Sequence, residues 1–216
     1  MLTEEDIVAS IKKIMERESK ESFDHIYVTS LSYCLPFTFY KLMLGAEFDD
    51  KFYVHSFRGE KIHKAFNEVF ETYFDDIVAE VPVNYRNLYG RVDYLSRKNK
   101  FTIEFKTTVS YKKLPFTWHW RQAEYYKALF GVERGYLVYF VLQSGEFRIF
   151  CSERDNVAIL AEIDERLDAL ETAKKLHDEH RITECLKCLK KYADSSMCSF
   201  CQFRKTGICR IKKIKD

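Results

Sequence analysis

The sequence predicts a mixed α/β domain, and three observations lead to this class. Helical and strand-like segments alternate only in part, with three strand-like runs in succession. Hydrophobic residues make up 46% of the 216 residues, with 18 Phe and 14 Tyr, enough for a substantial core. Three prolines and seven glycines interrupt the chain, and no linker or internal repeat stands out. We therefore expect one domain with an accessory module.

The first half of the chain has helical patterns followed by strands. Residues 3–20 read as an amphipathic helix with Thr3 as N-cap, and the aromatic stretch 31–40 leads into a short helix. Apolar side chains recur at helical spacing over residues 59–80. Period-two alternation then predicts three strands, at residues 79–85, 89–96 and 100–107.

The second half returns to helices around two more strands. A helix is expected over residues 118–130, because Gly131 follows it at the position where helices commonly end. Residues 136–142 form a continuous apolar strand that turns back into residues 146–151, and a long helix follows over residues 155–180. The chain then ends in a cysteine-rich tail.

Two neighbouring strand-like runs, Gly90-Arg-Val-Asp93 and Phe101-Thr-Ile-Glu104-Phe-Lys106, carry the main chemical signal. Alternate side chains of a strand share a face, so Glu104 and Lys106 point together, away from the apolar alternates. Asp93 lies one strand away. Two carboxylates can hold a hard divalent cation, and a lysine can stabilise developing negative charge. This combination suits metal-dependent hydrolysis of phosphodiesters.

The triplet Glu-x-Lys alone is weak evidence, since Glu18-Ser-Lys20 repeats it on a polar helix face. Its second copy has suitable neighbours. Gln122 and Tyr126 share a helix face and could hold the lysine and a phosphate, although a helix surface with one packed aromatic is the alternative. His63 lies beside the apolar stripe of its helix, where it is either a core-edge histidine or a ligand that favours Mn²⁺ over Mg²⁺.

Charge is unevenly distributed along the chain. The net charge is +2, yet residues 185–216 hold nine Lys and Arg against two Asp, a net of +7. This basic end favours a polyanionic partner, with a solvated charged face as the alternative. The acidic start lacks the features of a signal peptide, and no run of 18 apolar residues occurs. We expect a cytoplasmic protein without a membrane partner.

The seven cysteines predict a metal centre. Five of them lie within the last 32 residues and include two CxxC pairs, which argues against a secreted disulfide scaffold. Zinc would be held by Cys185, Cys188, Cys198 and Cys201. An iron-sulfur cluster would instead take Cys198, Cys201 and Cys209 with one distant cysteine, and would join the two ends of the chain. Spacing alone leaves both open, while Cys151 reads as a core thiol.

Taken together, these motifs resemble the RecB-like branch of the PD-(D/E)XK nuclease superfamily. Arg58-Gly-Glu-Lys-Ile-His63, Gly-Arg-Val-Asp93, Glu104-Phe-Lys106 and Gln122-Ala-Glu-Tyr-Tyr126 follow in that family's order. The resemblance implies a restriction-endonuclease-like mixed β-sheet flanked by helices. It implies that Mn²⁺ or Mg²⁺ is bound by His63, Asp93, Glu104 and the carbonyl of Phe105. Lys106 would orient or activate the attacking water, and Gln122 and Tyr126 would position the lysine and the DNA.

The cysteines extend the resemblance to the iron-sulfur RecB-like exonucleases, above all the CRISPR-associated exonuclease of the fourth Cas family. Ser32-Tyr-Cys34-Leu-Pro-Phe near the start joins Cys198-Ser-Phe-Cys201 and Cys209 at the end. The resemblance implies a 4Fe-4S cluster on Cys34, Cys198, Cys201 and Cys209, with Cys185 and Cys188 as alternative ligands. It divides the chain into a nuclease domain, 1–184, and a cysteine-rich module, 185–216, stapled to Cys34.

The function so implied is a metal-dependent exonuclease that acts on single-stranded DNA or DNA ends. Its setting would be CRISPR spacer acquisition, with other adaptation proteins as partners and an oligomer compatible with the sequence, or a viral or mobile-element counterpart. A non-catalytic nucleic-acid-binding or assembly subunit and a zinc-ribbon DNA-binding protein are the alternatives. Residues 111–121 mix cations with aromatics, so Lys112, Lys113 and Arg121 are candidate DNA contacts, while packing of the aromatics into the core is the alternative.

Overall fold

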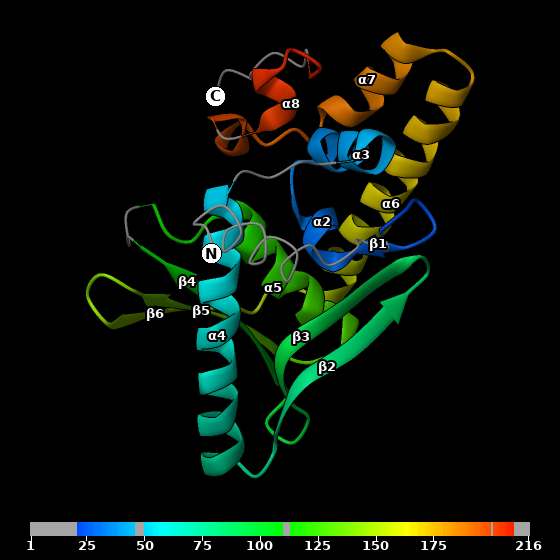
Figure 1. Ribbon diagram of the computed structural model, residues 1–216. Helices are drawn as coiled ribbons and strands as arrows, with labels where there is room; N and C mark the ends of the chain where they lie inside the picture. Colours follow the sequence, from blue (N-terminus) through cyan, green and yellow to red (C-terminus); the bar gives the residue numbers. More distant parts are fainter. Residues whose placement is uncertain (1–20, 46–49, 110–112, 200, 210–216) are drawn as a thin grey trace, which may run out of the picture.

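A computed structural model describes residues 21–45, 50–109, 113–199 and 201–209, so the helix predicted at residues 3–20 lies outside the described residues. The described part is a mixed β-sheet with helices on both faces (Figure 1). The strands are β1 (Ile26–Tyr27), β2 (Ile77–Tyr85), β3 (Leu88–Ser96), β4 (Phe101–Thr108), β5 (Arg134–Val141) and β6 (Glu146–Ser152). The helices are α2 (Val28–Ser32), α3 (Leu35–Leu44), α4 (Asp50–Tyr73), α5 (Thr117–Leu129), α6 (Asn156–Asp178), α7 (Ile182–Lys190), the 3₁₀ turn η1 (Ser195–Ser199) and α8 (Gln202–Lys205).

Strand β3 organises the sheet, because it has three partners. The antiparallel strand β2 covers one edge along its whole length. The other edge is shared, with parallel β1 at Leu88 and Tyr89 and antiparallel β4 from Tyr94 to Ser96. Strand β4 continues in parallel pairing with β5, and β6 closes the sheet antiparallel to β5. Residues 90–93 of β3 consequently have no strand partner on the shared edge.

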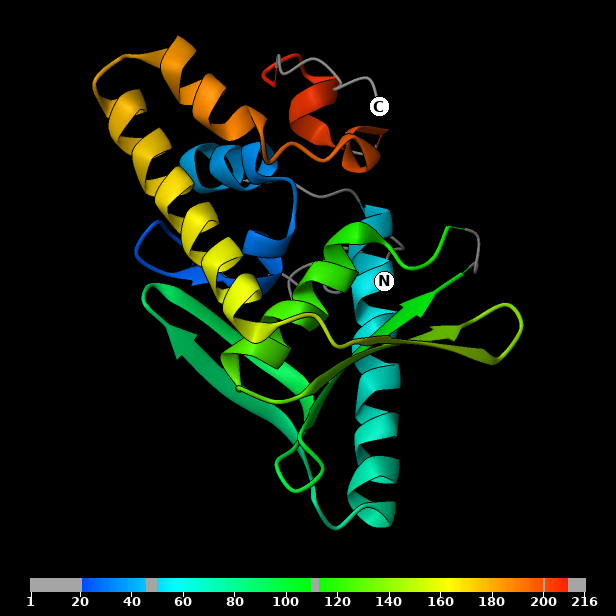
Figure 2. The same cartoon turned by 180° about the vertical axis from the view of Figure 1, so that it is seen from behind.

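Two helices cover opposite faces of this sheet, as the front and back views show (Figures 1 and 2). Helix α4 packs Ile62, Phe66 and Phe70 on one face, where it meets Ile103 and Phe105 of β4. Helix α5 lies on the other face, over β5, with α6 beyond it. The alternation along β4 therefore separates an apolar face toward α4 from the face that carries Glu104 and Lys106, as the strand pattern predicts.

The helix predicted at residues 59–80 ends earlier than expected, at Tyr73. Ile77, which the helical pattern included, instead begins β2. The physical reason lies at Asp76, whose carboxylate accepts hydrogen bonds from the Ser96 hydroxyl and, at 2.6 Å, from the amide of Asn99. These bonds attach the turn after α4 to the turn between β3 and β4, so the chain reverses there and continues as a strand.

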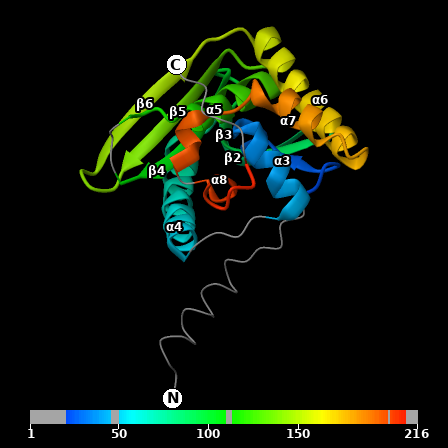
Figure 3. The ribbon, with the colours of Figure 1, turned by 90° about the horizontal axis from the view of Figure 1, so that it is seen from above.

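The C-terminal part adds a helix that the sequence analysis did not predict. Helix α7 packs along α6, and its Cys185 and Leu189 are buried in the main core. Position 185, where the two expected domains divide, lies within this helix. The later segment packs elsewhere: η1 and α8 pack with α3. Helices α3 and α8 lie at one end of the molecule (Figure 1), and the view from above shows them beside each other (Figure 3). Across the described ranges, no helix combines the length and apolar character needed to span a membrane.

Candidate active site

The site lies where β3 and β4 separate. Their ladder ends at the pair Tyr94 and Ile103, so the edge of β4 beyond that point lacks a β3 partner. The carboxylate of Asp93 takes over this role, since its Oδ2 accepts a hydrogen bond from the Phe105 N–H at 2.7 Å. The Phe105 N–H, which has no β3 carbonyl to bind, thus fixes the Asp93 carboxylate between the two strands. The ring of Phe105 itself is buried against α4, 4.7 Å from the ring of Phe66.

Glu104 and Lys106 lie side by side on the α5 face of β4, as the sequence predicts. Lys106 Nζ donates to Glu104 Oε1 at 2.6 Å, and the Glu104 side chain is only 3% exposed. Burial, followed by the charge of Asp93, raises the pKa of Glu104 to about 7 against the opposing effect of Lys106. The pKa of Lys106 is raised, because Glu104 and Asp93 together outweigh its burial.

His63 reaches the same point from the opposite face of the sheet. Its Nδ1 lies 3.5 Å from Asp93 Oδ1, and its ring meets that of Phe105 edge-on. Burial disfavours the imidazolium, but the hydrogen bond and charge of Asp93 outweigh burial, so the pKa of His63 lies above its ordinary value. The opening between β3 and β4 thus lets His63 of α4 contact Asp93, which also binds the backbone of β4.

Helix α5 supplies the two remaining predicted residues. The Tyr126 hydroxyl accepts the Arg91 N–H at 3.2 Å and so occupies the unpaired stretch of β3. Gln122 donates to the Thr29 hydroxyl at 3.0 Å. Its Oε1, the atom that could accept from Lys106, is buried without a partner in the described part of the chain. Tyr126 therefore helps to hold the site together, while Gln122 connects α5 to α2.

Two residues, Gly90 and Thr29, contribute to this site in ways that the sequence did not predict. Gly90 has no room for a side chain, because an added Cβ would lie 2.8 Å from the Tyr126 ring and 2.6 Å from Val28. A glycine inside a strand pattern is a known sign of such close approach, and it could have been read here. The role of Thr29 could not have been predicted, since its contact with Gln122 joins residues 93 positions apart.

The donors around Asp93 suit a hard divalent cation. Glu104 Oε2 is buried and makes no hydrogen bond to any described residue, although a buried carboxylate oxygen without a partner is costly. Its neighbours are a second carboxylate, an imidazole and a backbone segment, which together match the oxygen-rich ligand set of Mn²⁺ or Mg²⁺. Within the described ranges, however, no three His, Cys, Asp or Glu side chains are already assembled as a metal site.

The cysteines fall into two separate groups. Cys34 and Cys201 are buried in one small cluster, and Cys209 packs against it. Burial raises the pKa of the Cys34 thiol to about 11, with Cys209 and Cys198 as further causes, so all four cysteines of the predicted iron-sulfur set lie at this end of the molecule. The Cys34 N–H also contacts the sulfur of Met197 at 3.2 Å.

The alternative pair Cys185 and Cys188 lies on α7 instead. Cys185 is 1% exposed and belongs to the main core, and Cys188 packs against the same core. The thiol of Cys188 is directed at the Cys185 carbonyl, at 3.1 Å, as expected for a thiol within a helix. In this arrangement Cys185 and Cys188 contribute to the packing of α7 on α6.

The three candidate DNA contacts have different surroundings. Lys112 lies outside the described residues. Lys113 is exposed, with a backbone φ of 69°. Arg121 is turned inward, where its guanidinium donates to the Ser32 carbonyl at 2.6 Å and pairs with Glu162. Of the aromatics nearby, the rings of Phe116 and Trp118 stack on each other with centroids 4.9 Å apart. Both are partly buried and pack against two of the core clusters.

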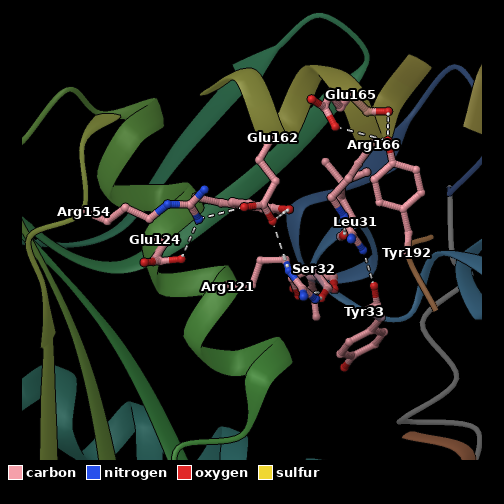
Figure 4. A network of polar contacts seen from close by, with 12 residues as sticks. Leu31, Ser32, Tyr33, Arg121, Glu124, Arg154, Glu162, Glu165, Arg166 and Tyr192 are labelled. Carbon is pink, nitrogen blue, oxygen red and sulfur yellow. Dashed lines mark hydrogen bonds and ion pairs between the residues drawn. The ribbon is translucent and has the colours of Figure 1, made fainter. Parts of the chain in front are cut away.

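Arg121 is part of an ionic network that fixes α2 (Figure 4). Arg166, 3% exposed, donates to the carbonyls of Leu31, at 3.0 Å, and Tyr33. Both arginines therefore bind carbonyls at the end of α2, where a helix has no internal partners for them. Glu162 joins the network from α6 and also accepts from Arg154 at 2.7 Å. The network holds Tyr33 in place, and with it the adjoining Cys34 of the cysteine cluster.

The fold and this site define a mixed α/β protein with a buried Glu104–Lys106 pair where two strands of its sheet separate. No known family model matches the sequence, and no curated protein sequence matches it. Solved structures do. The crystal structure of SSO0001 matches with a TM-score of 0.62 at 21% identity, over 97% of this chain and 96% of that one.

An exonuclease is among the matching structures. LHK-Exo, solved in complex with dAMP, has a TM-score of 0.53 at 15% identity, over 76% of this chain and 95% of its own. A phage-related exonuclease from Haemophilus somnus 129PT has a TM-score of 0.49 at 14% identity, over 76% and 91% of the two chains. The match to LHK-Exo shows that this chain shares the fold of an exonuclease.

Proposed function

We propose that the protein is a divalent-metal-dependent deoxyribonuclease, an exonuclease that acts on single-stranded DNA or DNA ends. The observation that carries the proposal is the buried, unpartnered Oε2 of Glu104 next to Asp93 and Lys106. A structural ion pair would use both carboxylate oxygens, whereas a metal site leaves one for the cation. The exonuclease fold of LHK-Exo supports the same class of reaction.

Each residue has a role in this proposal. Asp93, Glu104, His63 and the Phe105 carbonyl would hold Mn²⁺ or Mg²⁺, which when bound polarises a phosphoryl oxygen and lowers the pKa of water. Lys106, fixed by Glu104, presents a permanent positive charge to the phosphate as negative charge develops. The Phe105 N–H keeps the Asp93 carboxylate oriented. Tyr126 and Gln122 hold α5 against β3 and α2.

We further propose a 4Fe-4S cluster on Cys34, Cys198, Cys201 and Cys209. Shared burial of Cys34 with Cys201, and the proximity of Cys198 and Cys209, support this set. The zinc set would need Cys185 and Cys188, which pack in the other core cluster. The cluster would staple α3 to the C-terminal segment, and the basic charge of that segment would face DNA.

The cellular role remains a proposal from family resemblance. CRISPR spacer acquisition, or a viral or mobile-element counterpart, would supply single strands and ends as substrate and other adaptation proteins as partners, in the cytoplasm. Lys113, exposed beside the site helix, is the candidate DNA contact that we retain. Arg121 is not assigned this role, because its donors are used inside the fold.

The proposal is tested with Glu104→Gln and Lys106→Met. Each variant should lose roughly 10²-fold or more of Mn²⁺-dependent cleavage of linear single strands, because cation binding or charge stabilisation is removed. Glu18→Gln changes the other Glu-x-Lys triplet and serves as the matched control with unchanged activity. Wild-type cleavage rates in both site variants would contradict the assignment. Wild-type protein that binds DNA without cutting it would favour the non-catalytic subunit.

A further inference from the structure

A cavity of about 600 Å³ lies beside Asp93. The unpaired stretch of β3 forms one wall, with Gly90, Arg91 and Tyr126, and the β1–α2 segment forms another. Cavities of this size accommodate small organic ligands of nucleotide dimensions. Because Asp93 is among its lining residues, the cavity adjoins the proposed cleavage site directly.

Two donors in this cavity retain capacity for a ligand. Lys41 lines it and donates to the Glu21 carboxylate and, at 3.0 Å, to the Ser30 hydroxyl. An ammonium has three N–H donors, so one remains. The Thr29 hydroxyl also lines the cavity, and since it accepts from Gln122 its own proton is available to donate. Both groups suit the oxygens of a sugar-phosphate.

Two tyrosines give the cavity aromatic walls. Tyr89 is stacked on His25, with ring centroids 3.9 Å apart and a 12° angle between planes. Tyr27 meets the same histidine edge-on at 5.2 Å. The shared contact with His25 holds both rings in place. Rings fixed in this way offer apolar surface to any nucleobase, without preference for sequence.

The negative groups of the cavity are accounted for. Glu80 lies on the wall, held at φ 58°, and its carboxylate is paired with Arg91. Asp93 is the carboxylate that the proposed cation would neutralise. The ammonium of Lys41 is paired with Glu21, and its remaining N–H is the donor that the cavity offers to an anion.

We propose that this cavity receives the terminal nucleotide of the DNA strand, which rests on the proposed nuclease function. Lys41 and Thr29 bind its sugar-phosphate, and Tyr27 and Tyr89 lie beside its base. The scissile phosphate then lies at Asp93, between the cavity and Lys106. A cavity that holds one nucleotide requires a free strand end and leads to release of mononucleotides.

The first test measures binding of dAMP in Mn²⁺ by titration calorimetry, with cleavage of linear and circular single strands in parallel. Lys41→Met should weaken dAMP binding at least tenfold and slow cleavage of linear strands similarly. Lys174→Met is the matched control, since Lys174 is also paired with a carboxylate but lies on α6 outside the cavity. Equal dAMP affinity in Lys41→Met and wild type would overturn the proposal.

The second test uses wild-type protein alone and so does not depend on a variant that folds. Linear strands with a fluorescein-modified base at either terminal position are compared with unmodified strands. The bulky terminal base should slow its release at least tenfold at the end that the enzyme attacks, while the same modification ten nucleotides inside should not delay the first cut. Equal rates at both positions would overturn the cavity assignment and leave the nuclease assignment standing. No cleavage of any strand would overturn the nuclease function itself.

Discussion

A buried carboxylate such as Glu104 is stable only with a compensating charge. Lys106 supplies one positive charge, but Asp93 adds a second negative charge nearby, and the pKa of Glu104 rises to about 7. At acidic pH the carboxyl group of Glu104 is therefore protonated, and it must lose this proton before it can bind a cation. Deprotonation of Glu104 and binding of a cation are then linked equilibria.

This linkage predicts how Mn²⁺ binding depends on pH. Below pH 7 the cation must displace the proton of Glu104, and the raised pKa of His63 adds to the competition. We expect the Mn²⁺ dissociation constant to rise roughly tenfold from pH 7 to pH 6 and to change little from pH 8 to pH 9. Calorimetric titration at these four values measures it. An affinity independent of pH would contradict the predicted role of Glu104.

At the scale of elements, the site depends on how closely α5 approaches β3. Gly90 permits this approach, since Tyr126 occupies the place of a side chain. The hydroxyl of Tyr126 then takes the N–H of Arg91, which no strand satisfies. Helix α5 thus supplies a hydrogen-bond acceptor to the stretch of β3 that has no neighbouring strand on this edge.

Two glycine substitutions should have opposite effects. Gly90→Ala forces α5 and β3 apart, and we expect it to lower the free energy of unfolding by about 1–3 kcal/mol. Gly59→Ala lies in α4 with its nearest neighbour, the Thr107 hydroxyl, 3.6 Å away. Here alanine should stabilise the protein by about 0.5–1 kcal/mol, as in other helix interiors. Urea unfolding of the two variants beside wild type measures both changes, and a Gly90→Ala variant at least as stable as wild type would contradict the packing described for Gly90.

The sequence predicted most of these elements but not how they meet. Period-two alternation places Glu104 and Lys106 on one face because the period of a strand depends on local geometry alone. The end of α4 was misplaced, since Ile77 fits a helical stripe and only a contact of Asp76 with a distant turn makes it a strand. Contacts such as that of Thr29 with Gln122 arise from the docking of whole elements and leave no local pattern.

At the scale of the whole molecule, helix α3 meets the segment that follows α7. The Leu35 N–H contacts the Tyr192 carbonyl at 3.3 Å, and the Tyr40 hydroxyl contacts the Ile208 carbonyl at 3.4 Å. Arg166 of α6 holds the chain just before Cys34. The cysteine cluster is therefore attached to the rest of the described fold on several sides. Helix α7 was missed because its cysteines suggested ligands where the structure shows a packed helix.

Two buried cysteines distinguish the proposed metal sets. Cys34→Ala should abolish the brown colour and the iron content of anaerobically purified protein, because it removes a ligand. Cys185→Ala changes another buried thiol, in the main core, and should retain both the colour and the iron. Iron, sulfide and zinc analysis with a visible spectrum measures the result. Colourless wild-type protein with one zinc per chain would support the zinc set instead.

The edge of β3 and β4 has a consequence for observing the site in solution. The amides of Arg91 and Phe105 are held by the side chains of Tyr126 and Asp93, whereas their neighbours are held by other strands. Their hydrogen exchange should therefore respond to changes in those two side chains while the surrounding sheet stays protected. Two backbone protons thereby become natural reporters of the centre, readable by NMR without any label attached to the protein.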